Sequence, residues 1–248
     1  MGGFIVNDCF KVLSLGGGVQ STAMLYLVQD GVLSKPDIVI FADTGSEMPE
    51  TYKLINDVIK PLCRNINVNF EIVKSHLGHS LDEYYKSRSV IPVIGVSHCT
   101  AKFKIRPIRR KIREYVGNGR GKKLAECWLG ITTDENQRES ISDVKWVSNV
   151  FPLLELNYSR NDCINYLTSK GLKVEKSGCF MCPYNSSEKW VRVKNNYPEL
   201  WKRALDLEDT YFENRPYRYK GLRDDGKKLR QPLTNFSKSK CDSGGCFI

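Results

Sequence analysis

The most constraining feature of this sequence is a short apolar run that stops at three consecutive glycines and leads directly into a helical pattern. The run covers Phe10–Leu15, the glycines are Gly16, Gly17 and Gly18, and a helix is predicted over Ser21–Gln29. Glycines let the backbone approach a ligand closely, and the free N–H groups and dipole at the start of a helix attract anions. This order of strand, glycine turn and helix predicts a phosphate-binding loop.

The rest of the first 171 residues continues the alternation of strands and helices. Its strand runs are apolar without a period of two, which is typical of a parallel sheet covered on both faces. The sequence therefore predicts an α/β domain over residues 1–171, with a Rossmann-like parallel sheet and helices on both of its faces. Further strands are predicted at Asp37–Ala42, Asn67–Val73, Cys127–Ile131 and Val150–Leu154, and further helices at Pro49–Cys63, Lys102–Val116 and Ser159–Lys170, the last with Ser159 as N-cap.

A second region, residues 172–248, differs in pattern and composition. A Gly-Cys turn leads to predicted helices at Ser187–Asn195 and Pro198–Phe212. From Asn214 onward the chain is basic and polar and shows no clear periodicity. We interpret that stretch as a basic, extended tail or a substrate-clamping arm.

Positive charge is concentrated in two stretches of a chain whose net charge is +10. Residues 102–123 hold ten basic residues and one acidic residue, and residues 215–240 hold nine basic and two acidic residues. Such clustering predicts a polyanionic partner, with a solvated face as the alternative. Four aromatic residues accompany the second stretch, as stacking on nucleic-acid bases would require: Tyr211, Phe212, Tyr217 and Tyr219.

No apolar run approaches the ~18 residues that would span a bilayer, and the first residues do not resemble a signal peptide. We therefore expect a cytoplasmic protein with no membrane partner, and a homodimer is one option for its oligomeric state. The chain has nine cysteines, an odd number that in a reducing compartment favours metal binding, redox chemistry or burial over a disulfide framework. Cys9, Cys63 and Cys163 lie in apolar or helical patterns and are expected in the core. Cys179 and Cys182 flank two residues at a Gly/Pro turn, the spacing of two metal ligands or of a redox dithiol.

The glycine turn resembles the PP-loop, Ser-Gly-Gly-x-Asp-Ser, of the ATP pyrophosphatases, a superfamily of the HUP type that splits ATP into AMP and pyrophosphate. Gly17, Gly18 and Ser21 fit this pattern, whereas Gly16 stands in place of the leading Ser and Gln20 in place of the Asp. The resemblance implies that ATP and Mg²⁺ bind here, through Ser14, Gly16, Gly17, Gly18, Gln20, Ser21 and Thr22.

Later blocks resemble the phosphoadenosine phosphosulfate (PAPS) reductases in the order of that family. They are Asp43-Thr44-Gly45 with Pro49-Glu50-Thr51, Cys99 with Lys104 and Pro107, Gly130 with Asp134, Glu135 and Arg138, and Gly178-Cys179 with Cys182-Pro183. An acid at the end of a strand beside the first βα turn is where nucleotides bind in an open α/β sheet. The resemblance implies that Asp43 serves Mg²⁺ or the nucleotide and takes part in catalysis. It implies that Lys104 and Arg138 neutralise phosphate charge, and that Asp134 or Glu135 binds a metal or the substrate. It also implies that the nucleotide contacts Thr44, Gly45 and Gly130.

The same likeness places Cys99 beside the late turn, so the implied metal ligands are Cys99, Cys179 and Cys182. Reductases that bind a [4Fe–4S] cluster carry a Cys-Cys pair where this chain has His98-Cys99. Three thiolates would leave one iron open, as the resemblance to the tRNA thiolases of this superfamily implies, and that iron can carry sulfide. Zinc completed by His98 or Cys127, and no metal at all, are the alternatives.

Cys241 and Cys246 partly match the C-terminal catalytic cysteine of PAPS reductases. They are interpreted as a mobile persulfide or resolving pair, as extra metal ligands, or as an incidental tail. Three functions follow from the whole sequence. The first is ATP-dependent adenylation of tRNA or DNA for sulfur transfer, with a sulfur donor such as a cysteine desulfurase. The second is a PAPS or APS reductase that forms sulfite, and the third is a non-catalytic nucleic-acid-binding subunit.

Overall fold

The computed structural model describes residues 9–96, 98–119, 122–223 and 225–233, so Cys241 and Cys246 lie outside the described residues. The chain forms two compact units, each built from separate stretches of sequence. The first contains residues 9–41, 53–73 and 108–175, and the second contains residues 42–52, 74–107 and 176–233. The boundary predicted after residue 171 lies near the last of these divisions, while residues 42–52 and 74–107 fall in the second unit.

Most of the first unit is built around a five-stranded sheet with the strand order β3-β2-β1-β4-β5. Its strands are β1 (Phe10–Leu15), β2 (Ile38–Asp43), β3 (Asn69–Lys74), β4 (Ala125–Trp128) and β5 (Val147–Val150). β1 pairs in parallel with β2 and β4, and β4 pairs in parallel with β5. In β2, Ile38, Val39 and Ile40 have no exposed surface, because helices cover both faces of the sheet.

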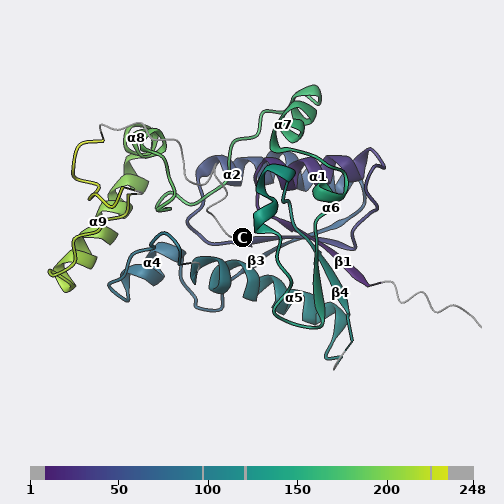
Figure 1. The fold of residues 1–248 in the computed structure, drawn as a ribbon, viewed down its shortest axis with the longest axis horizontal. Helices are drawn as coiled ribbons and strands as arrows, with labels where there is room; N and C mark the ends of the chain where they lie inside the picture. Colours follow the sequence, from purple (N-terminus) through teal and green to yellow (C-terminus); the bar gives the residue numbers. More distant parts are fainter. Residues whose placement is uncertain (1–8, 97, 120–121, 224, 234–248) are drawn as a thin grey trace, which may run out of the picture. The chain divides into compact units, whose positions relative to one another are not determined.

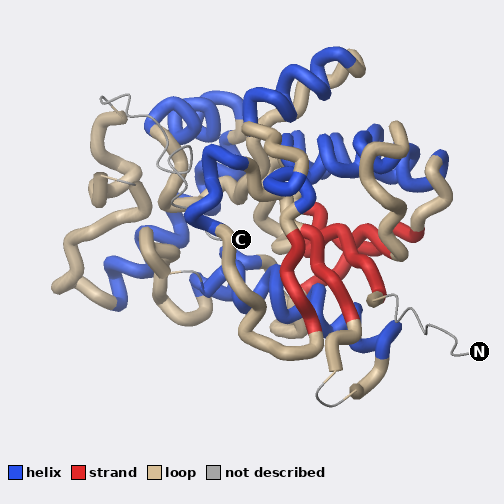
Figure 2. The backbone as a smooth tube through the Cα atoms, turned by 45° about the vertical axis from the view of Figure 1, so that its right-hand side comes forward, coloured by secondary structure: helices blue, strands red, loops and turns tan. Residues whose placement is uncertain are grey.

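The helices of this unit lie on both sides of the sheet, with α1 and α7 against each other on one side and α5 on the other (Figures 1 and 2). The predicted parallel α/β fold is therefore confirmed. Along the chain, α1 (Val19–Gln29) follows β1, α2 (Pro49–Leu54) and α3 (Lys60–Asn65) follow β2, α5 (Arg106–Val116) precedes β4, and α6 (Pro152–Glu155) and α7 (Arg160–Ser169) follow β5.

Two of the long helices predicted from the sequence contain a wider π-helical turn just before a proline. The turn Ile55–Ile59 precedes α3, whose second residue is Pro61, and the turn Thr100–Ile105 precedes α5, whose second residue is Pro107. Proline has no N–H to donate and its ring crowds the preceding turn, so a locally widened helix accommodates it.

The strand predicted at Val150–Leu154 is wrong in its position. β5 ends at Val150, and α6 begins at Pro152. Pro152 cannot donate to a strand ladder, and its fixed φ suits the first position of a helix. The apolar residue Leu153 is buried by this short helix instead.

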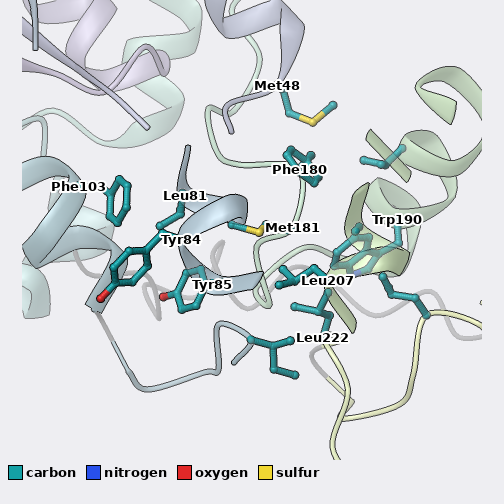
Figure 3. Close-up of a cluster of buried hydrophobic side chains, with 14 residues drawn as sticks. Met48, Leu81, Tyr84, Tyr85, Phe103, Phe180, Met181, Trp190, Leu207 and Leu222 are labelled. Atoms are coloured by element: carbon teal, nitrogen blue, oxygen red, sulfur yellow. The ribbon is translucent and has the colours of Figure 1, made fainter. Parts of the chain in front are cut away.

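The second unit has a hydrophobic core of its own (Figure 3). Its helices are α4 (Leu81–Lys86), α8 (Ser187–Asn196) and α9 (Pro198–Asn214), and α9 packs against both α4 and α8. Phe180, Met181 and Trp190 have no exposed surface in this core, which also takes in Leu222 and Leu229 from the basic stretch.

Residues 221–223 and 225–230 are packed against α9, which corrects the prediction of an extended tail for this part of the chain. The buried carboxylate of Glu208 on α9 accepts one hydrogen bond from the Leu222 N–H at 2.8 Å and one from the Leu229 N–H at 2.7 Å. A Cβ at Gly221 would lie 2.5 Å from an oxygen of Glu208, so only glycine fits there. The sequence could not predict this loop, because the contacts that hold it involve two backbone N–H groups and the space around one glycine.

Candidate functional site

The glycine turn between β1 and α1 is shaped by its own backbone. Gly17 has a φ of +67°, a conformation that favours glycine. The Gly16 N–H donates to Ser21 Oγ at 3.2 Å, and that hydroxyl donates to the Gly18 carbonyl at 3.4 Å. Gly18 is the N-cap residue and offers no side-chain acceptor to α1. The N–H groups of the first turn of α1 are therefore suited to an anionic ligand.

Gly130, which follows β4, lies against the start of α1. A Cβ at this position would lie 3.0 Å from both the Gln20 Cβ and the Ser21 backbone nitrogen. The absence of a side chain thus allows the segment after β4 to approach the glycine turn, and two stretches more than 100 residues apart in sequence meet in the first unit.

Buried polar side chains after Gly130 also contact the start of α1. The Gln20 side-chain amide donates to Glu135 Oε2 at 3.4 Å, and Arg138 forms an ion pair with the same oxygen at 2.7 Å. Glu135 is 3% exposed and Arg138 is 8% exposed. Among the described residues, two further nitrogens of Arg138 and the hydroxyls of Thr22 and Thr132 are buried without a hydrogen-bond partner. Buried donors of this kind are costly unless a ligand satisfies them, and an anion would do so for the guanidinium.

The other residues expected near the nucleotide take different places. Asp134 is exposed, and its carboxylate accepts a hydrogen bond of 2.7 Å from the Arg160 N–H at the start of α7. Ser14 lies within β1 and pairs in register with Ile40 of β2. Asp134 therefore stabilises the first turn of α7, while Glu135 is the acid that contacts the glycine turn.

The Asp43-Thr44-Gly45 segment belongs to the second unit from its first residue onward. Asp43 accepts hydrogen bonds of 2.8 Å from both the Tyr52 hydroxyl and the Gly45 N–H, and Lys74 lies 3.5 Å from its other oxygen. Gly45 has a φ of +70°, and a Cβ there would lie 2.8 Å from the Ser80 Cβ. These contacts hold the Asp43 carboxylate in one orientation at the end of β2.

Three cysteines from distant segments line one cavity of about 40 Å³ in the second unit: Cys99, Cys179 and Cys182. Cys99 immediately precedes the π-helical turn at Thr100–Ile105, and the other two lie in the turn before α8. A space of this volume suits a few atoms of water or sulfide size and excludes a nucleobase.

Glu47 is a functional candidate that sequence reasoning missed. It forms an isolated antiparallel bridge with Cys179, and residues opposite each other in such a bridge present their side chains on the same side. Glu47 is 4% exposed, and one of its oxygens lies 3.5 Å from Lys104 Nζ. Its other oxygen is buried and has no partner among the described residues. The only sequence signal was an acid inside the Asp43–Thr51 block, because the bridge itself is a long-range contact.

The backbone on either side of this bridge fixes the cysteine turn. The Phe180 N–H donates to the Ser46 carbonyl at 3.1 Å, and the Met48 N–H donates to the Gly178 carbonyl at 3.3 Å. Lys104, expected to bind phosphate, thus lies in the second unit, paired with Glu47 beside the cysteine turn.

The chemistry of the thiols depends on their surroundings. Burial raises the pKa of the Cys99 thiol, and hydrogen bonding to Cys182 together with burial raises the pKa of the Cys179 thiol. Thiols in this state carry their protons at neutral pH, and a bound metal would have to displace them. No disulfide joins cysteines in the described part of the chain.

Within the described residues, no three Cys, His, Asp or Glu side chains meet the geometry of a single bound metal ion. Tetrahedral zinc with bonds of about 2.3 Å would need sulfurs about 3.8 Å apart. Of the alternative zinc ligands, His98 is exposed and directly precedes Cys99, whereas Cys127 is buried on β4 in the first unit. The three cysteines are a convergent donor set rather than a formed mononuclear site.

A parallel α/β sheet with a glycine turn at the start of its first helix is the architecture of a nucleotide-binding protein. Residues 11–176 match the phosphoadenosine phosphosulfate reductase domain, and the chain belongs to this family. Every helix that the structure describes is too short or too polar to cross a membrane.

Three relatives illustrate the range of this likeness. The uncharacterized protein MJ0973 of Methanocaldococcus jannaschii is 26% identical over 94% of this chain, which spans 57% of that protein's length. A phosphoadenosine 5'-phosphosulfate reductase of Cronobacter sakazakii is 28% identical over 65% of this chain and 62% of its own length. The solved U34-tRNA thiolase NcsA of Methanococcus maripaludis, which contains a [4Fe–4S] cluster, matches 83% of this chain and 72% of its own, with 22% identity and a TM-score of 0.47. The chain thus spans about half the length of the curated relatives it matches first.

Proposed function

We propose that this chain is an ATP-dependent sulfurtransferase that adenylates an oxygen of tRNA or DNA so that sulfur can replace it. The observation that carries the proposal is the convergence of Cys99, Cys179 and Cys182 on one small cavity, in a chain that also has a glycine turn suited to phosphate. Family membership supports adenine-nucleotide and sulfur chemistry, and the two basic stretches support a nucleic-acid substrate.

In this proposal the first unit holds ATP. The N–H groups of the glycine turn and the start of α1 would bind its phosphates, and the partnerless nitrogens of Arg138 would take part of the phosphate charge. Glu135 forms an ion pair with Arg138 and accepts a hydrogen bond from Gln20. It therefore places a buried carboxylate beside the start of α1, although Gln20 itself is an amide where the PP-loop pattern has an Asp. Mg²⁺ would accompany ATP, with Glu135 as the oxygen donor that we favour within the first unit.

In type, the three thiols match the ligands of a [4Fe–4S] cluster, and the cavity of about 40 Å³ that they line would have to widen to take the eight atoms of its core. Three thiols suit iron–sulfur or zinc sites, and the cavity that they line is bordered mainly by apolar residues and glycine, as thiolate-ligated centres commonly are. When bound by three thiolates, such a cluster has one iron free to carry sulfide. Tyr85, whose hydroxyl interacts with the Cys99 thiol, and Glu47, opposite Cys179, would orient the ligands from outside, as the outer partners of metal ligands do.

The two chemical steps balance without an oxidant or reductant. The substrate oxygen attacks the α-phosphorus of ATP, a P–O bond breaks, and pyrophosphate leaves. Hydrosulfide then attacks the carbon or phosphorus that bears the adenylated oxygen, AMP leaves with that oxygen, and the proton of hydrosulfide passes to solvent. A cysteine desulfurase is the class of enzyme that would supply the sulfur as a persulfide. Two equivalents of a thiol reductant would release it as hydrosulfide and leave as a disulfide. A homodimer is a further proposal for the assembly.

The alternative is a reductase that forms sulfite from PAPS, which the likeness to the Cronobacter enzyme favours. One set of assays on anaerobically purified full-length protein separates the two. Pyrophosphate release from ATP that depends on added RNA or DNA is expected, together with iron and acid-labile sulfide near four atoms per chain. Sulfite from PAPS plus a thioredoxin, with no pyrophosphate release, would establish the alternative. Stoichiometric zinc without iron would contradict the cluster.

A further inference from the structure

Two tyrosines in the second unit are unusually exposed for aromatic residues. Tyr217 is 71% exposed and Tyr219 is 77% exposed. Each has a cation over its ring: the Arg218 guanidinium lies 5.4 Å from the Tyr217 ring centre, and Lys220 Nζ lies 6.0 Å from that of Tyr219. Aromatic side chains bury large apolar areas when they can, so two rings this exposed, on residues two positions apart, are candidates for contact with a ligand.

The structure separates these two residues from the other aromatics of the basic stretch. Tyr211 and Phe212 pack edge to face, and Lys228 lies 3.8 Å from the centre of the Phe212 ring. Tyr211 also packs against the hydrophobic core of the second unit. Of these four aromatic residues, Tyr217 and Tyr219 are therefore the two that are most exposed to solvent.

The segment that carries the two tyrosines is fixed at both ends. Before it, Arg215 Nε donates to the Ser89 carbonyl at 2.9 Å. After it, Leu222 has no exposed surface, and its N–H is bound by Glu208. Because the segment is already anchored, its backbone loses little conformational entropy when a ligand binds, and this favours binding.

The hydrogen bond of Arg215 to Ser89 connects the tyrosine segment to a stretch of chain that borders the cysteine cavity. Ser89 lies three residues before Pro92, and Pro92, Val93 and Val96 line that cavity. Val93 and Val96 are also 41% and 43% exposed, so the border of the cavity presents apolar surface to solvent. The tyrosine segment and the cavity border are thus connected through one stretch of backbone within the second unit.

We infer that Tyr217 and Tyr219 form a stacking platform for unpaired bases of a single-stranded nucleic acid, with Arg218 and Lys220 on its phosphates. This inference rests on the proposed function and specifies how its substrate is held. Bases in a duplex have both faces covered by neighbours, so stacking on protein aromatics selects single strands, loops or flipped bases. The cations beside the rings match a polyanion, and their charge would oppose a cationic partner.

The test is fluorescence anisotropy of the full-length protein with a labelled single-stranded oligonucleotide, as RNA and as DNA, and with the matching duplex. Replacing both tyrosines (Tyr217→Ala with Tyr219→Ala) is expected to weaken single-strand binding by at least about tenfold, because the stacking of two bases is lost. The Phe pair (Tyr217→Phe with Tyr219→Phe) should bind within about threefold of wild type, since stacking needs only the ring. The exposed control Ile141→Ala, at a side chain 98% exposed in the first unit, should have no effect.

Salt dependence distinguishes stacking from charge. The Ala pair should keep the slope of log affinity against log salt, whereas Arg218→Gln should reduce it by about one phosphate contact. Equal binding by the Ala pair and wild type, a Phe pair as weak as the Ala pair, or duplex bound as tightly as single strand would each overturn the platform.

The experiments can contradict the stacking platform and the proposed reaction independently of each other. Single-strand binding that is lost in the Ala pair, without any pyrophosphate release from ATP, keeps the platform and removes the reaction. Pyrophosphate release stimulated equally by nucleic acid in wild type and in the Ala pair keeps the reaction and removes the platform. Circular dichroism and iron content, unchanged in all variants, ensure that a loss of binding does not reflect unfolding.

Discussion

The glycine turn of the first unit and the cysteine cavity of the second are built in opposite ways. The turn is one continuous stretch, Ser14–Thr22, and its shape comes from backbone conformation and two hydrogen bonds of Ser21. The cavity takes its donors from Cys99 and from the Cys179–Cys182 turn, and a bridge to a third segment at Glu47 fixes that turn.

This difference teaches where each site is vulnerable. A site made of local backbone depends on the space around its glycines and tolerates many side-chain changes nearby. A site assembled from distant segments depends on every donor and on the packing that brings the segments together. Substitutions at the two sites, and at residues outside both, test this contrast.

The largest effect is expected at the assembled site. Cys99→Ser, Cys179→Ser and Cys182→Ser should each lose most of the bound iron and lower sulfur transfer by more than about 100-fold, because each removes one of three thiolates. Iron analysis after anaerobic purification measures this loss. Cys9→Ser is the matched control, since Cys9 has intermediate exposure like the other three and lies in the first unit. Full iron content in any one of the three variants would show that its thiol is not a ligand.

The next effect is expected at the glycine turn. Gly130→Ala should weaken ATP binding by about tenfold, since its methyl group would lie 3.0 Å from the Ser21 nitrogen and must push the segment after β4 away from α1. Calorimetric titration with a non-hydrolysable ATP analogue measures the affinity. Gly31→Ala is the control: Gly31 has a φ of +74°, but an added methyl group there would meet no atom within 4 Å. It should cost about 1 kcal/mol of unfolding free energy and leave ATP affinity unchanged.

A smaller and pH-dependent effect is expected within the second unit. Burial acts to raise the pKa of Asp82, but hydrogen bonds from Arg203 and Ser46 outweigh it and hold that pKa below the ordinary value. The stability from Asp82 is therefore complete above pH ~4 and is lost as the pH falls further. Asp82→Asn should lower the unfolding free energy by about 1–2 kcal/mol at pH 7.

Urea denaturation of wild type and Asp82→Asn at pH 7, 5, 4 and 3 measures this dependence. The difference between the two proteins should be constant from pH 7 to pH 5 and shrink as the pH falls below about 4. Lys53→Gln, which breaks an exposed ion pair with Asp57, is a control expected to leave stability nearly unchanged at every pH. A difference that grows on acidification would contradict the role given to the Arg203 and Ser46 hydrogen bonds.

The smallest effect is expected at Gly16, where the PP-loop pattern has a serine. The nearest atom to a Cβ at this position is Ser21 Oγ, 4.0 Å away, so a side chain has room. Gly16→Ser should change the unfolding free energy by less than about 0.5 kcal/mol and ATP affinity by less than about threefold. A large loss of stability would mean that the turn needs glycine at all three positions and is as sensitive to side chains as the cysteine cavity.

The sequence by itself determined the elements whose causes are local. β1 is found at Phe10–Leu15 as predicted, and Ser159 caps α7 with a hydrogen bond from the Asp162 N–H. Apolar runs, glycine turns and capping residues act over a few residues, so their consequences can be deduced from spacing alone.

Tertiary structure decided the rest. It placed Glu47 opposite Cys179, folded residues 221–223 and 225–230 around Glu208, and left Tyr217 and Tyr219 exposed while Tyr211 and Phe212 packed. These outcomes depend on contacts between segments far apart in the chain, whose favourable terms are the burial of apolar surface and the satisfaction of buried polar groups. Neither quantity is a property of a short stretch of residues, which is why the sequence could name the cysteines and tyrosines but could not say which of them meet or face solvent.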